Sequence, residues 1–171
     1  MDTEHNASIV GDQWAQCERD HGWLWDAAAD GVSAQAPTLI LAHGSGAPMD
    51  SGFMTDFAAR LAALGVNVLR FEFPYMAQRR LDGGKRPPNT TPKLLEHWRE
   101  VYGVVRRHVA GPLAIGGKSM GGRMASMIAD ELGADALVCL GYPFYAVGKP
   151  EKPRVAHLPE LKAPTLIVQG E

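Results

Sequence analysis

Short, uninterrupted apolar runs alternate along this chain with longer segments in which apolar residues recur every three to four positions. Runs of this kind are typical of strands buried on both faces, and the periodic segments are typical of helices. Because strand and helix alternate, the sequence predicts a three-layer α/β fold with a mostly parallel sheet, right-handed crossovers and helices on both faces. The predicted strands cover residues 37–42, 66–71, 113–115, 136–140 and 164–168.

Residues that favour helix ends mark three predicted helices. Asp50 or Ser51 can cap the first helix, and Gly65 can end it in a left-handed conformation. The second helix starts at Thr91, directly before a proline. The third covers residues 119–133.

The composition indicates one globular domain. Of 171 residues, 46% are hydrophobic and 21% are charged, and the formal net charge of -2 argues against general nucleic-acid binding. The first residues lack a basic region followed by an apolar stretch, and no apolar run is long enough to span a membrane. We therefore expect a cytoplasmic protein that has neither a nucleic-acid nor a membrane partner.

The chain is expected to divide into an N-terminal segment, residues 1–30, and an α/β core, residues 31–171. The N-terminal segment shows no clear pattern and is expected to pack poorly, although Trp23 and Trp25 alternate as they would in an antiparallel edge strand. Cys139 falls inside a predicted strand, where a buried free thiol is expected.

The motif Gly117-Lys118-Ser119-Met120-Gly121 lies between a predicted strand and a predicted helix. This is the setting of a G-x-S-x-G nucleophile elbow, in which a serine on a sharp turn is flanked by glycines because side chains there would collide. The same residues end a phosphate-loop pattern, but that pattern requires glycine at position 112, which is proline. Ser119 is therefore the candidate nucleophile.

A second glycine-rich segment, His43-Gly44-Ser45-Gly46, follows the first predicted strand. Ligands bind beyond the carboxyl ends of parallel strands, where this segment and the elbow are both expected. Acyl transfer needs two donors for the oxygen that becomes negative. We predict that the backbone N–H of Met120 supplies one donor and that of Ser45 or Gly46 the other.

Histidines offer few candidates for a general base. His43 is interpreted as a side chain that orders the loop, because it lies on the same loop as the predicted oxyanion donors. His157 is the alternative base, since it lies between the last two predicted strands. His97 and His108 fall on the long predicted helix and are expected to be solvated. His and Cys spacing predicts no metal site, and no cofactor is expected.

Basic residues cluster after the second predicted strand. They are Arg79, Arg80, Lys85 and Arg86. The simpler interpretation is a solvated loop face. The alternative is anion recognition, because the cluster follows the carboxyl end of a strand.

Several motifs together resemble one protein family. The chain is similar to the dienelactone-hydrolase-like α/β hydrolases, in the branch of the testis-expressed-30 and NSL-complex-subunit-3 type domain. The resemblance extends from about Pro37 to the end of the chain. The segments that carry it are 41–51, 70–76, 85–88, 116–126, 139–144, 148–150 and 168–171.

The resemblance implies a serine nucleophile at Ser119 that attacks a small-molecule ester-like bond, with an acid just after Glu171 and a histidine further on. The chain would then be a truncated serine hydrolase that lacks the final strand and helix and is inactive by itself. Residues 165–168 would form an apolar edge strand that favours self-association. The alternative is a noncatalytic scaffold of the same fold that binds protein partners, which the same branch also contains.

Overall fold

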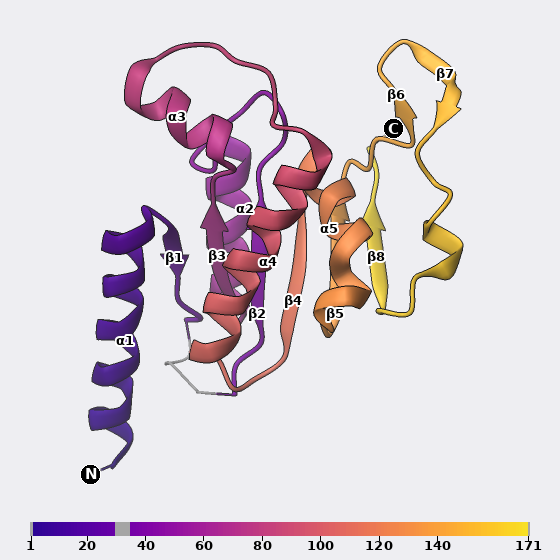
Figure 1. Cartoon of the computed structure of the whole chain (residues 1–171). Helices are drawn as coiled ribbons and strands as arrows, with labels where there is room; N and C mark the ends of the chain where they lie inside the picture. The colour runs from indigo at the N-terminus through magenta and orange to yellow at the C-terminus, as the bar shows by residue number, and fades with distance from the viewer. Residues whose placement is uncertain (1, 30–34, 171) are drawn as a thin grey trace.

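The structure is a computed structural model that describes residues 2–29 and 35–170. Its centre is a six-stranded sheet with the order β1-β3-β2-β4-β5-β8. In Figure 1 the strand labels follow this order from left to right. β1 is antiparallel to β3, and the other neighbouring pairs are parallel, which confirms the predicted mostly parallel sheet. The strands are β1 (Leu24–Asp26), β2 (Thr38–Ala42), β3 (Asn67–Phe71), β4 (Leu113–Lys118), β5 (Ala136–Leu140) and β8 (Thr165–Val168), with β6 (Tyr145–Ala146) and β7 (Lys149–Pro153) in a separate hairpin.

Helices cover both faces of the sheet, as predicted. In Figure 1, α4 and α5 lie in front of the sheet, and α2 lies behind it. No helix among the described residues is both long and apolar enough to cross a membrane. The helices are α1 (Asp2–His21), α2 (Gly52–Ala63), α3 (Pro74–Asp82), α4 (Thr91–His108) and α5 (Met120–Leu132), with a short 3-10 helix at Leu158–Glu160.

The central strand β2 shows why its sequence is apolar throughout. Ile40 and Ala42 belong to the large core cluster on the side of α4 and α5. Leu39 and Leu41 belong to a second cluster on the side of α2. Because alternate side chains point to opposite faces of a sheet, a strand covered on both faces needs an apolar residue at every position.

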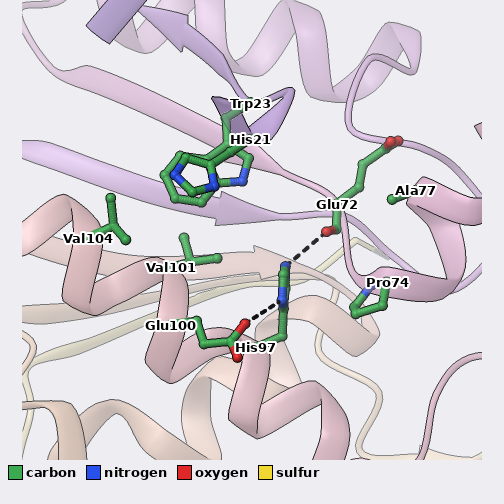
Figure 2. Close-up of a pocket in the computed structure, with 9 residues that line it drawn as sticks. All are labelled: His21, Trp23, Glu72, Pro74, Ala77, His97, Glu100, Val101 and Val104. Atoms are coloured by element: carbon green, nitrogen blue, oxygen red, sulfur yellow. Dashed lines mark hydrogen bonds and ion pairs between the residues drawn. The ribbon is translucent and has the colours of Figure 1, made fainter. Parts of the chain in front are cut away.

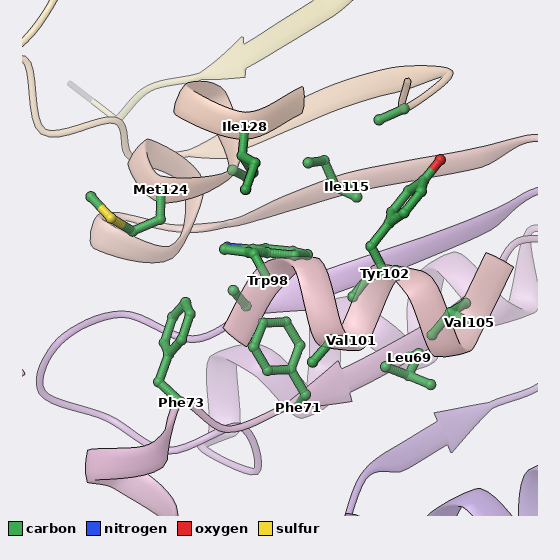
Figure 3. Close-up of a cluster of buried hydrophobic side chains, with 14 of the residues drawn as sticks. Leu69, Phe71, Phe73, Trp98, Val101, Tyr102, Val105, Ile115, Met124 and Ile128 are labelled. Atoms are coloured by element: carbon green, nitrogen blue, oxygen red, sulfur yellow. The ribbon is translucent and has the colours of Figure 1, made fainter. Parts of the chain in front are cut away.

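The larger core cluster is centred on Trp98, a fully buried residue of α4. Its ring packs edge to face on Phe71 of β3, with ring centroids 4.8 Å apart. In Figure 3 the indole also lies beside Met124 and Ile128 of α5. Trp98 therefore joins the two front helices to the sheet.

Most helix ends follow their predicted signals. Gly133 directly follows α5, and Gly65 follows Leu64, the C-cap residue of α2. Both glycines have positive φ angles, +91° at Gly65 and +67° at Gly133. Ser51 occupies the N-cap position of α2, but its hydroxyl makes no capping hydrogen bond, so that part of the prediction is wrong.

The N-terminal segment packs against the core between Trp14 and Ala28, contrary to the prediction. Most of it forms α1, in which the ring of Trp14 stacks on that of Trp25 at 3.8 Å, and the carboxylate of Glu18 accepts the N–H of Trp25. The helix was missed because its apolar residues are few and widely spaced. The strand expected near Trp23 and Trp25 is β1, which lies at the edge of the sheet.

The basic cluster does not lie on a loop alone, because Arg79 and Arg80 belong to the helix α3. The prediction of a loop face was wrong for these two residues. The sequence did contain a signal, since Pro74 occupies the first helical position and Gly83 ends the helix with a φ angle of +70°. Proline just inside the start and glycine just past the end are typical of a short helix.

Candidate active site

Ser119 lies on a sharp turn between β4 and α5, where its backbone is strained. Its φ and ψ angles are 50° and -116°, and it is the one non-glycine residue with positive φ in the described part of the chain. The turn is held by the N–H of Ser119, which donates to Leu140 O at 2.8 Å, and by Ser119 O, which accepts the N–H of Arg123 at 3.0 Å. Strain of this kind costs about 1–3 kcal/mol and clusters at functional sites.

The glycines of the motif allow three backbone segments to approach one another. A Cβ atom at Gly117 would lie 2.6 Å from the carbonyl carbon of Gly121 and 2.7 Å from Ala42 O. A Cβ atom at Gly121 would collide with His43 O. The end of β2, the end of β4 and the start of α5 therefore meet at distances that leave no room for side chains.

The glycine-rich segment after β2 lies beside the elbow. A Cβ atom at Gly44 would be 3.4 Å from Lys118 O and 3.8 Å from the Cβ of Ser119. Gly44 is buried, whereas Ser45 and Gly46 are exposed. The tertiary structure therefore brings the predicted nucleophile and the predicted oxyanion loop together.

His43 is fully buried, and both of its ring nitrogens have hydrogen-bond partners. Its Nε2 accepts the N–H of Phe73 at 3.1 Å, so the proton of the neutral ring is on Nδ1, which donates to Gly44 O at 2.6 Å. Burial lowers the pKa of His43 and favours this neutral form. With both nitrogens engaged, His43 orders the loop and is not placed to take a proton from Ser119.

Side chains from β3 and the segment after it hold the loop from the other side. The hydroxyl of Tyr75 donates to Ser45 O at 3.0 Å, and burial raises the pKa of Tyr75 to about 12, so it remains a donor. A carboxylate oxygen of Glu72 accepts the N–H of Met49 at 3.3 Å, and the guanidinium of Arg70 donates to Met49 O at 2.9 Å. The residue pattern by itself did not reveal these partners.

Arg80 is engaged by two carboxylates. Its guanidinium donates to both carboxylate oxygens of Glu72, at 2.8 and 2.9 Å, and to both of Asp50, at 2.8 and 3.1 Å. These hydrogen bonds lower the pKa of Asp50. Because Glu72 also holds the loop, Arg80 fixes the carboxylate that binds Met49.

The other basic residues of the cluster are placed differently. Arg86 pairs with Asp82 at 2.8 Å, so a carboxylate of the chain already neutralises it. Arg79 is half-buried on α3, and Lys85 is exposed after the end of that helix. The cluster therefore does not present four equivalent cations to a ligand.

The other candidate histidines do not contact Ser119. Nε2 of His157 lies 2.7 Å from Ser126 Oγ on α5, so the structure pairs it with a different serine. His97 and His108 are half-buried and hydrogen-bonded to backbone carbonyls, contrary to the expectation of solvated side chains. Among the side chains that the structure describes, Ser119 Oγ has no hydrogen-bond partner.

No metal site or disulfide competes with this chemistry within the described residues. No group of three or more His, Cys, Asp or Glu side chains there could hold a metal ion. Cys17 and Cys139 are buried free thiols, and burial raises the pKa of Cys139 to about 11, which makes it unreactive.

A mostly apolar cavity of about 390 Å³ adjoins the elbow. Lys118 and Leu140 belong both to this cavity and to the backbone around Ser119. The ammonium of Lys118 lies 4.4 Å from the ring centroid of Phe53, and this contact forms part of the wall. The lining residues are Phe53, Phe57, Lys118, Leu140, Gly141, Val168 and Gly170.

The strain at Ser119 predicts an unusual mutational effect. Ser119→Gly is expected to stabilise the fold by about 1 kcal/mol, because glycine removes most of the strain at positive φ but increases the entropy of the unfolded chain. Equilibrium urea unfolding measures the change. Ser119→Ala keeps the strained backbone and should not be stabilised, and equal stability of the two variants would contradict this account.

Solved structures with similar folds include several hydrolases. An alpha-beta serine hydrolase homologue from Coxiella burnetii superposes with a TM-score of 0.68 and 21% identity, over 86% of this chain and 67% of that one. XC6422 from Xanthomonas campestris, a serine hydrolase without a lid, gives 0.62 and 20%, over 86% and 76%. Est1E from Butyrivibrio proteoclasticus with bound ferulic acid gives 0.59 and 19%, over 70% of this chain but only 48% of that one.

Sequence comparison agrees with the fold. No curated protein matches the chain. A family model described as an alpha/beta hydrolase domain matches residues 35–171, which include β2, the glycine-rich loop and the elbow. The chain therefore belongs to the alpha/beta hydrolase domain family.

Proposed function

We propose that the chain carries the nucleophile and the oxyanion hole of a serine hydrolase that cleaves an ester-like bond through an acyl-enzyme. The strained backbone of Ser119 is the main support. A φ angle of 50° is unfavourable for serine, and the motif keeps it at the carboxyl end of a parallel sheet, where ligands bind in such folds. A protein that used this fold only as a scaffold would have no chemical need for the strain.

In the proposed reaction Ser119 Oγ attacks the carbonyl carbon of the substrate. The oxygen that becomes negative accepts hydrogen bonds from the N–H of Met120, at the start of α5, and from that of Ser45 or Gly46. The alcohol then leaves with a proton, and water hydrolyses the acyl group from Ser119. The apolar cavity beside the elbow can hold an apolar part of a small substrate.

We do not assign the general base to a histidine of the described chain. His43 and His157 are both hydrogen-bonded elsewhere. Because a serine hydroxyl without a base is a weak nucleophile, the proposal includes that these 171 residues alone show no appreciable ester turnover. This leaves the noncatalytic scaffold as the second candidate function.

Within the family we place the chain in the dienelactone-hydrolase-like branch, of the testis-expressed-30 and NSL-complex-subunit-3 type. The support is the motif set of the sequence, above all segments 41–51, 70–76 and 116–126. The structure gives these three segments a common location, since they meet around His43, Phe73 and Ser119.

Labelling with a fluorophosphonate probe tests the proposed function. In the full-length protein, we expect the probe to modify Ser119, as peptide mass spectrometry would show, and Ser119→Ala should abolish the modification. Ser126→Ala is the matched control, because Ser126 Oγ lies 2.7 Å from Nε2 of His157 in a serine–histidine pair that the proposal does not use, so Ser126 should be dispensable for labelling. A folded wild-type protein that is not labelled would favour the scaffold.

A further inference from the structure

One peptide group, between Glu72 and Phe73, is hydrogen-bonded by a histidine on each side. Its carbonyl, Glu72 O, lies 3.1 Å from Nε2 of His97, and its N–H, on Phe73, donates to Nε2 of His43 at 3.1 Å. His43 in turn contacts Gly44 O through Nδ1 at 2.6 Å. The three contacts form one chain from α4 to the loop beside Ser119.

Donor and acceptor rules fix the direction of this chain. A carbonyl oxygen only accepts, so Nε2 of His97 must carry the proton that it shares with Glu72 O. Phe73 N–H only donates, so Nε2 of His43 is unprotonated and the proton of that ring points to Gly44 O. Each hydrogen bond polarises the next in a buried, low-dielectric setting. His97 thereby strengthens the bond that fixes the ring of His43.

The surroundings of His97 hold its ring in position for this role. Figure 2 shows the ring on α4, pointing to the backbone of Glu72, whose carboxylate extends away toward the loop. The ring packs near Phe71 and Phe73, with centroids 5.6 and 6.2 Å away. Its other nitrogen, Nδ1, lies 3.3 Å from the carboxylate of Glu100, which is mostly exposed. Burial lowers the pKa of His97, and a neutral ring with its proton on Nε2 has none on Nδ1 to donate to Glu100, so the bond to Glu72 O does not depend on that carboxylate.

We propose that His97 is a positioning residue for the oxyanion loop, acting through the Glu72–Phe73 peptide and His43. This inference rests on the proposed function, in which the loop supplies a donor to the oxyanion. Gly44 directly precedes Ser45 and Gly46, so a shift of His43 moves the predicted donors relative to Ser119. Misplaced donors would weaken transition-state stabilisation more than substrate binding.

Two polar variants of His97 that differ by one methylene provide the test. The side-chain amide of His97→Gln reaches the position of Nε2 and can still donate to Glu72 O, whereas that of His97→Asn is too short. In His97→Asn we expect the amide proton of Phe73 to exchange with solvent about tenfold faster than in the wild type, the factor for one lost neutral hydrogen bond. The Nδ1–H signal of His43 in ¹H–¹⁵N spectra should also broaden or disappear. In His97→Gln the exchange rate of the Phe73 amide should stay within about twofold of the wild-type rate. The Nδ1–H signal of His43 should remain as sharp as in the wild type.

Two further measurements separate positioning from general stability. Glu100→Gln removes the charge beside Nδ1 but leaves the bond to Glu72 O, so the signals of Phe73 and His43 should not change. In the full-length protein, His97→Asn should slow fluorophosphonate labelling of Ser119, and His97→Gln should restore the rate.

Equal behaviour of folded His97→Gln and His97→Asn at Phe73 and His43 would overturn the proposal. A change at Phe73 and His43 in Glu100→Gln that is as large as the change in His97→Asn would also overturn it. If no variant or wild-type protein is labelled, the proposed hydrolase function fails, while the signals of Phe73 and His43 still decide whether His97 positions the loop.

Discussion

Gly121→Ala is expected to destabilise the fold by about 3 kcal/mol or to prevent folding. A Cβ atom at this position would collide with His43 O and lie 2.8 Å from Ala42 O, and both obstacles are backbone atoms of buried residues, the last of β2 and the one after it. Backbone in the centre of a sheet cannot move aside as a side chain can. The loss of stability should therefore reach or exceed about 3 kcal/mol, the upper end of the range for overpacking a protein core. Urea unfolding followed by circular dichroism would measure it.

Gly103→Ala is the matched control, because it makes the same change inside another helix. A Cβ atom at Gly103 of α4 would meet only Arg107 Nη1, at 3.8 Å, which is an ordinary contact. Alanine loses less chain entropy than glycine in a helix, so this variant should be more stable than the wild type by about 0.5–1 kcal/mol. If both variants lost stability equally, close backbone approach would not explain the requirement for glycine at 121.

Trp98→Ala is expected to cost about 3–5 kcal/mol of unfolding free energy, the range for removing a fully buried large aromatic side chain. Trp98 contacts both the sheet and α5, so the cavity would open between layers that cannot collapse without moving a helix. Its Nε1 is buried without a hydrogen-bond partner among the described residues, so the loss is one of packing. The free energy of unfolding in urea gives the value.

Two variants control for this interpretation. Trp98→Phe keeps most of the ring and should cost well under half as much. Leu81→Ala removes an apolar side chain that is 81% exposed on α3, and it should change stability by less than about 0.5 kcal/mol. A cost for Leu81→Ala similar to that for Trp98→Ala would show that burial does not determine the effect.

The strands of the main sheet and three of the helices could be predicted because their signals are local, whereas the hairpin of β6 and β7 was not predicted. Each apolar run is short and continuous, and alternate residues of β2 enter the two core clusters. The glycines that follow α2 and α5 mark those ends within one or two residues. α1 escaped prediction because its packing depends on a few positions such as Trp14, whose partner Trp25 lies on the following strand. α3 was overlooked although its proline and terminal glycine were present in the sequence.

The elbow could be found from the sequence because its requirements lie within five consecutive residues, while its surroundings could not. Glycine at 117 and 121 and serine at 119 reflect steric limits of one turn. The partner of His43, in contrast, is the N–H of Phe73, which lies 30 residues away in sequence. A pattern of residue types does not reveal which backbone group from the neighbouring strand will face a given ring.

The sequence by itself determined the α/β architecture, the location of the sharp turn at Ser119 and the glycine-rich segment that follows β2. Those features arise from side-chain periodicity and from the space that glycine leaves, which are properties of short segments. Only the tertiary structure decided that the ring of His43 binds Gly44 O and Phe73 N–H, that Arg80 is held by Glu72 and Asp50, and that His97 reaches the same peptide from α4. The physical reason is that a hydrogen bond depends on distance and direction to within a fraction of an ångström, and these are set only when separate elements pack together.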